Sequence, residues 1–199
     1  MLVFVFSKVI PLNITNFPVF VFTALLPWNW FSSSLLAAGS TFTASRDLLR
    51  HPNVHPATLV VVTLLAHLMT LLVSLPVLFW MLYWYDLSFP WLFFPAFPLL
   101  VLVQGTWTVG LSFLIATANV FYRDVSQLIG ILISLLFFVT PVWFTPQSKG
   151  DYSFLFEINP MSLIVQNYRF VLLDQRGLDW PSLMTATLMG LGLLIIGYL

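Results

Sequence analysis

The sequence predicts an all-α integral membrane protein, a polytopic helical bundle formed by one domain of 199 residues. Only 7% of the residues are charged and 60% are hydrophobic, whereas a soluble domain carries about a quarter charged residues. The charges fall in clusters, and the charge-free stretches between the main clusters are each at least 20 residues long. That is the length a helix needs to cross a hydrocarbon core about 30 Å thick.

Continuous apolar runs such as Leu59–Val62 and Ile131–Ile133 indicate helices, because the strands of a membrane barrel alternate apolar and polar residues. Turn residues then divide the chain into five full spans and a partial one. The expected elements are a partial first span at 1–11, full spans at 17–42, 57–85, 92–121, 125–144 and 181–199, and an external segment at 145–180.

The first apolar element, Met1–Ile10, would reach only about 15 Å as a helix. It therefore resembles the end of a span whose beginning is missing, and 11–16 follows it as a turn. The span at 57–85 ends in an interfacial belt of tryptophans and tyrosines. In the span at 92–121, small residues three or four apart predict a face for close helix packing in lipid. They are Gly105, Thr108, Ser112 and Ala116.

Asn159–Pro160 is a favourable helix start, with an asparagine cap followed by a proline in the first turn. From Met161 to Leu173 the pattern is amphipathic, with Ser162, Gln166 and Arg169 on the polar face. Thirteen residues reach about 20 Å, which is too short to span a bilayer. We therefore expect a short re-entrant or interfacial helix before the last span.

The composition also excludes several functions. Seven basic and seven acidic residues leave no basic patch for nucleic acid, and the absence of cysteine excludes a disulfide or a thiolate metal site. The glycines at 105 and 110 lack the lysine of a phosphate-binding loop. His67 is the one ionisable residue within a long span, so an ion-coupled carrier is disfavoured. The Lys and Arg residues are evenly divided between the two sides, so they do not orient the chain.

Three stretches resemble the membrane subunits of ABC type-2 transporters that export polysaccharide, O-antigen or teichoic acid. Residues 25–34 (LLPWNWFSSS) resemble the family's second span, and 118–125 (ANVFYRDV) resembles its loop before the fifth span. Asn159-Pro160-Met161, followed by Tyr168-Arg169, resembles its external segment before the last span, and 138–142 (FVTPV) fits the end of the fifth. Order and spacing agree along essentially the whole chain.

The resemblance implies a multi-pass permease in the bacterial inner membrane that moves a glycan or lipid-linked glycan. It implies a homodimer that works with a P-loop ABC ATPase, so ATP and magnesium would bind that partner and no cofactor, metal or catalytic residue is expected on this chain. Three functional segments are implied: an ATPase-docking coupling loop facing the cytoplasm (Arg46, Asp47, Leu48, Leu49, Arg50), a second cytoplasmic loop (Tyr122, Arg123, Asp124), and an external gate helix (Asn159, Pro160, Tyr168, Arg169).

Members of that family begin with a surface helix and a full first span and end with a basic tail, so we expect this chain to be truncated at both ends. It also has Val54–Ala57 where the family usually places a more basic stretch. Two other functions stay open, namely a multidrug-type ABC permease and, less favoured, a membrane-embedded transferase. The transferase would use Asp47, His51, His55 and Asp124 at one membrane surface.

Overall fold

A computed structural model describes residues 16–122, 124–144 and 158–198, and every regular element in these ranges is a helix. The expected partial span at 1–11, Arg123 and residues 145–157 lie outside the described residues. The described helices are α2 (Phe17–Ala44), α3 (Arg46–Leu49), α4 (Pro56–Trp84), α5 (Phe93–Phe121), α6 (Val125–Val139), α8 (Pro160–Leu172) and α9 (Trp180–Tyr198). The prediction of an all-α helical membrane bundle is thus confirmed for the described residues.

Four helices, α2, α4, α5 and α9, are long and apolar enough to cross a membrane. Helix α6 has 15 residues and ends at Val139, five residues before the expected end of its span at 144. Thr140 takes an extended conformation (φ −84°, ψ 130°) because Pro141 follows it and disfavours a helical residue at that place. The expected count of five full spans is therefore not confirmed by helix length.

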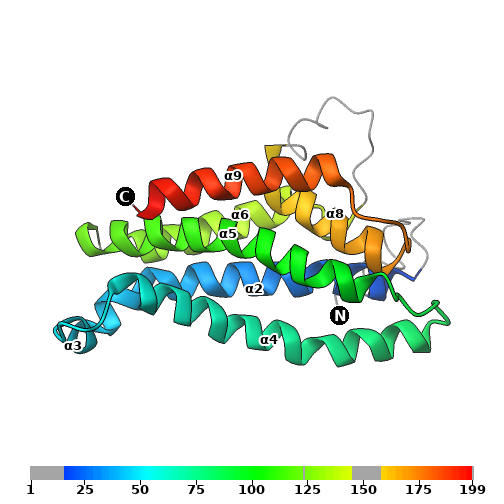
Figure 1. Ribbon diagram of the computed structural model, residues 1–199, viewed down its shortest axis with the longest axis horizontal. Coiled ribbons are helices and arrows are strands. Elements are labelled where there is room, and N and C mark those ends of the chain that lie inside the picture. Colours follow the sequence, from blue (N-terminus) through cyan, green and yellow to red (C-terminus); the bar gives the residue numbers. More distant parts are fainter. Residues whose placement is uncertain (1–15, 123, 145–157, 199) are drawn as a thin grey trace.

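Helix α2 lies at the centre of the bundle and packs against α4, α5, α6 and α8 (Figure 1). Two buried side chains connect it to its long neighbours. Trp30 Nε1 donates to the Leu64 carbonyl of α4 at 3.1 Å, and Gln104 Nε2 of α5 donates to the Pro27 carbonyl at 2.7 Å. Such polar contacts are favoured in lipid, where an unpaired amide or indole N–H finds no water.

Helices α5 and α9 run side by side and approach each other closely at glycines (Figure 1). A Cβ atom at Gly110 would lie 2.6 Å from the Leu194 backbone nitrogen, and one at Gly190 would lie 2.7 Å from Thr106 Oγ1. The predicted small-residue face lies elsewhere on α5. Thr108, Ser112 and Ala116 are buried, and Ala116 packs in a cluster with Val60 of α4.

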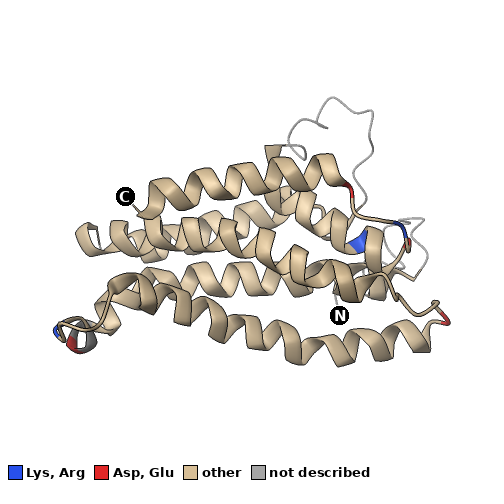
Figure 2. Ribbon diagram, viewed as in Figure 1, with Lys and Arg blue, Asp and Glu red and all other residues tan. Residues whose placement is uncertain are grey.

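The charged residues gather at two opposite ends of the bundle, with an uncharged middle between them (Figure 2). One end holds α3 and the junction between α5 and α6, and it is called the α3 end below (Figure 1). The other, called the α8 end, holds the turn after α4 and the loop from α8 to α9 (Figure 1). Two charged rims around an apolar centre are what a membrane-spanning bundle requires.

Candidate functional site

The predicted coupling loop forms the short helix α3 and the turn after it, at the extreme tip of the α3 end (Figures 1 and 2). Asp47 and Arg50 form an ion pair of 3.8 Å, with side chains 97% and 83% exposed. An ion pair this exposed adds little stability. Leu49 is half-buried. Because Asp47 and Arg50 are so exposed, both side chains are accessible to a partner protein.

The second predicted loop joins α5 to α6 at the same end. Tyr122 and Asp124 are exposed there. The turn is held from beneath by Asn119, whose Oδ1 accepts from the Ser126 backbone N–H at 3.2 Å and from the Ser126 hydroxyl at 2.7 Å. The same hydroxyl lies 3.4 Å from the Gly39 carbonyl oxygen of α2. The described parts of the two predicted loops therefore lie at the same end of the bundle (Figure 1).

At the predicted external helix, α8 begins as the sequence indicates. Asn159 is its N-cap and accepts from the Met161 backbone N–H at 3.0 Å, and Pro160 follows in the first turn. The side-chain Nδ2 of Asn159 donates to Thr140 Oγ1 at 3.0 Å. One side chain thus caps α8 and binds the end of α6.

The amphipathic interpretation of this helix needs correction. Ser162 and Arg169, both expected on a polar face, are as deeply buried as the apolar face, and only Gln166 of the three is half-buried. The reason is that α8 packs against α2, α5 and α9 and is surrounded by the bundle. It is therefore inserted among the other helices, where Asn167 and Arg169 find hydrogen-bond partners and the Ser162 hydroxyl finds none within the described residues.

Arg169 shows how such a polar group is accommodated. Its Nη1 donates to the Pro141 carbonyl at 2.6 Å and its Nη2 to the Val142 carbonyl at 2.7 Å, while its guanidinium carbon lies 3.5 Å from the centre of the Phe20 ring. A guanidinium stays protonated in proteins, so the side chain is a cation, and it holds the segment after α6 against α8 and α2.

Tyr168 is buried next to Arg169 along the helix. Its hydroxyl finds no hydrogen-bond partner within the described residues. The four predicted gate residues thus differ in role. Asn159 and Arg169 are tied to the end of α6, Pro160 begins the helix, and Tyr168 packs in the core.

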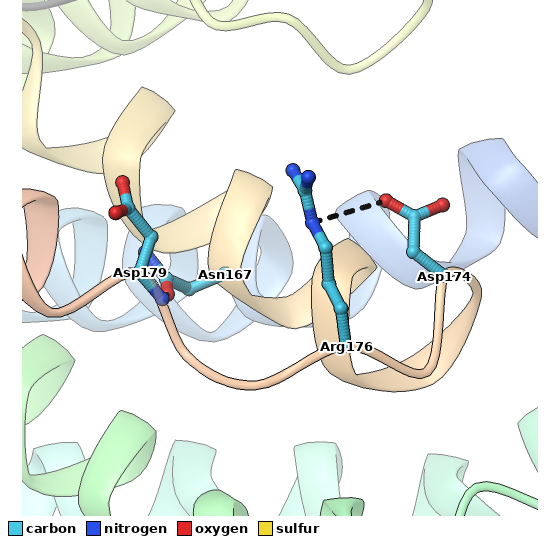
Figure 3. A network of polar contacts seen from close by, with 4 residues as sticks. All are labelled: Asn167, Asp174, Arg176 and Asp179. Carbon is cyan, nitrogen blue, oxygen red and sulfur yellow. Dashed lines mark hydrogen bonds and ion pairs between the residues drawn. The ribbon is translucent and has the colours of Figure 1, made fainter.

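Sequence reasoning missed Asn167, which connects α8 to α9. Its Nδ2 donates to Ser182 Oγ at 2.8 Å, and its Oδ1 accepts from the Asp179 backbone N–H at 2.8 Å. In the loop from α8 to α9, Arg176 lies between Asp174 and Asp179 and forms an ion pair with Asp174 at 3.7 Å (Figure 3). A lone asparagine in an apolar helix carries no pattern that predicts partners 12 and 15 residues away.

Arg169 and Arg176 also border a cavity of about 270 Å³ beside the α8 end, with Phe20, Gln166, Phe170 and Asp174 among its other walls. Within the described ranges, no three or more His, Asp or Glu side chains form a group that could hold a metal ion. What the described arrangement provides is two polar surfaces on opposite sides of an apolar bundle. Both ends carry exposed charges, and the α8 end also holds a buried one, Arg169.

No family model matches the chain. It is similar to an O-antigen export system permease protein RfbA of Myxococcus xanthus, with 36% identity over 192 residues that cover 92% of this chain and 72% of that protein. It is also similar to two proteins of that name from Klebsiella pneumoniae, at 26% and 25% identity over 169 residues. These alignments cover 83% of this chain and 64% of the Klebsiella proteins.

Proposed function

The chain belongs to the family of O-antigen export system permeases, and from this premise we propose that it is the membrane subunit of an ATP-driven exporter of O-antigen or a related lipid-linked glycan. The 36% identity over nearly the whole chain carries this proposal. The charge distribution supports it, because an uncharged bundle with polar ends suits a protein that forms a path across a membrane. We place the chain in the bacterial inner membrane.

The energy would come from a separate ABC ATPase, which binds ATP and magnesium. We assign its docking surface to the α3 end, where Asp47 and Arg50 are almost fully exposed and Tyr122 and Asp124 are exposed as well. This places the α3 end in the cytoplasm and the α8 end outside. Movement of the ATPase would then act on α2 through α3, which directly follows it in the chain.

The fifth span would consist of α6 together with the non-helical residues 140–144 after it. Helix α6 alone reaches about 22 Å, and the segment from Thr140 to Phe144 continues it toward the α8 end. Arg169 satisfies carbonyls of that segment, which lipid could not do. In this arrangement α8 enters the membrane from outside and serves as the external gate helix.

A second copy of the chain would complete the path. Helix α6 exposes large apolar side chains along its length, among them Leu128, Ile131, Leu132, Leu135 and Phe138. Lipid or a second copy can cover such a face equally well. A homodimer is proposed because the family resemblance implies it, and the exposed apolar face of α6 is compatible with it.

The test is export itself in a strain that lacks the gene for this chain but keeps the ABC ATPase of the same system. We expect O-antigen to disappear from the surface and to accumulate inside, and we expect the plasmid-borne gene to restore it only when the ATPase can hydrolyse ATP. Unchanged surface glycan together with new drug sensitivity would contradict the proposal and favour the multidrug alternative.

A further inference from the structure

Five polar residues form a patch halfway along two membrane-spanning helices. The midspan polar patch consists of Asn29 and Ser33 on α2 and His67, Thr70 and Ser74 on α4. All five lie within about 6 Å of the middle of their helices at 1.5 Å per residue. If these helices cross the membrane, the patch lies near the bilayer midplane.

The patch is open on one side and closed on the other. Asn29 and Thr70 are exposed, and Ser33, His67 and Ser74 are half-buried. Behind them Trp30 is buried, and its bond to the Leu64 carbonyl holds α2 and α4 together. The five residues line a cavity of about 50 Å³ along with Leu26, Trp30 and Leu71. That volume is large enough to admit water.

Most of these side chains have no partner within the described parts of the chain. Ser74 donates to the Thr70 carbonyl of its own helix at 2.7 Å. The side chains of Asn29, Ser33, His67 and Thr70 make no hydrogen bond to another described residue. Polar groups left unpaired in hydrocarbon are costly, and in membrane proteins they face a protein interior or a water-filled cavity. The patch therefore does not face lipid in the working protein.

The chemistry of the patch suits a neutral, hydroxyl-bearing ligand. Its amide, hydroxyl and imidazole groups both donate and accept hydrogen bonds, and no Asp, Glu, Lys or Arg lines the cavity. Ser, Thr, Asn and His side chains also hydrogen-bond across packed helices in membranes, so another helix is the alternative occupant, but the space left beside these side chains is large enough for water. We propose that the midspan polar patch faces a hydrated path and hydrogen-bonds the hydroxyl groups of a sugar chain that moves along it. The sugar-chain part rests on the proposed function.

The absence of cysteine makes a clean test possible, because each introduced thiol is the only one in the chain. Single variants Ser33→Cys and Thr70→Cys probe the patch. Met69→Cys and Val73→Cys are matched controls at the same depth of α4, where the native side chains are 61% and 76% exposed. The chain is studied in membranes together with its ATPase, and the probe is a charged, membrane-impermeant methanethiosulfonate.

We expect the two patch thiols to react at least ten times faster than the two control thiols, because the reagent and the thiolate both need water. Equal or slower reaction at the patch would overturn the proposal, whether lipid or another helix covers it. A bulky adduct at position 33 or 70 should also block export, and unchanged export after complete labelling would overturn the sugar-chain part. The reaction rates are independent of export, so failure of the proposed function would be recognised separately.

Discussion

The two polar ends of the molecule are built in opposite ways. At the α3 end, Asp47 and Arg50 are almost fully exposed and pair only with each other at 3.8 Å. At the α8 end, Arg169 is only 5% exposed and donates hydrogen bonds to the carbonyls of Pro141 and Val142, in the segment after α6. The difference teaches that charge near a membrane surface has two uses. Exposed charge is available to a partner, whereas buried charge fixes the fold.

The largest effect should come from removing the buried charge. Arg169→Met leaves the carbonyls of Pro141 and Val142 buried without a donor, and each unsatisfied group costs about 1–3 kcal/mol. We expect the unfolding free energy to fall by about 3 kcal/mol, seen as a lower apparent melting temperature in detergent. Arg176→Met is the control, because Arg176 pairs with Asp174 only at an exposed position. Equal melting temperatures for the two variants would mean that Arg169 does not stabilise the α8 end.

A smaller effect is expected at Asn159, which makes two separate bonds. Asn159→Ala removes the helix cap, worth about 1 kcal/mol, and also the bond to Thr140. Asn159→Asp keeps an oxygen for the Met161 N–H but loses the donor to Thr140. We therefore expect the aspartate variant to melt between the native chain and the alanine variant. If the aspartate variant melts with the alanine variant, the cap contributes nothing measurable and only the bond between α8 and α6 matters.

Local chemistry predicted some of this arrangement. The cap at Asn159–Pro160 and the boundaries of the long helices follow from turn residues and apolar length, and the structure places them within two residues of expectation. The early end of α6 at Val139 was also predictable, since a residue before proline avoids the helical conformation.

Other features depend on tertiary packing and could not be predicted from one sequence. The amphipathic pattern predicts Arg169 in the helix before the last span, but its partners are backbone carbonyls 27 and 28 residues earlier, which carry no side-chain signal. The burial of Ser162 depends on which helices surround α8. The close approach at Gly110 depends on its alignment with Leu194 of α9, and the predicted face did not include it. The surroundings of Arg169, Ser162 and Gly110 are all determined by how the helices pack against one another.

The central claim is that the exposed α3 end binds an ABC ATPase, and co-purification of the tagged chain with the ATPase of its own system tests it most directly. We predict that the native chain retains the ATPase and that the double variant Arg46→Glu with Arg50→Glu loses it, while its melting temperature stays unchanged because the Arg50 ion pair is exposed. Exchange of both residues to Lys should keep the association. Retention of the ATPase by the Glu variant would contradict the docking assignment, and failure of the native chain to bind it would contradict the claim altogether.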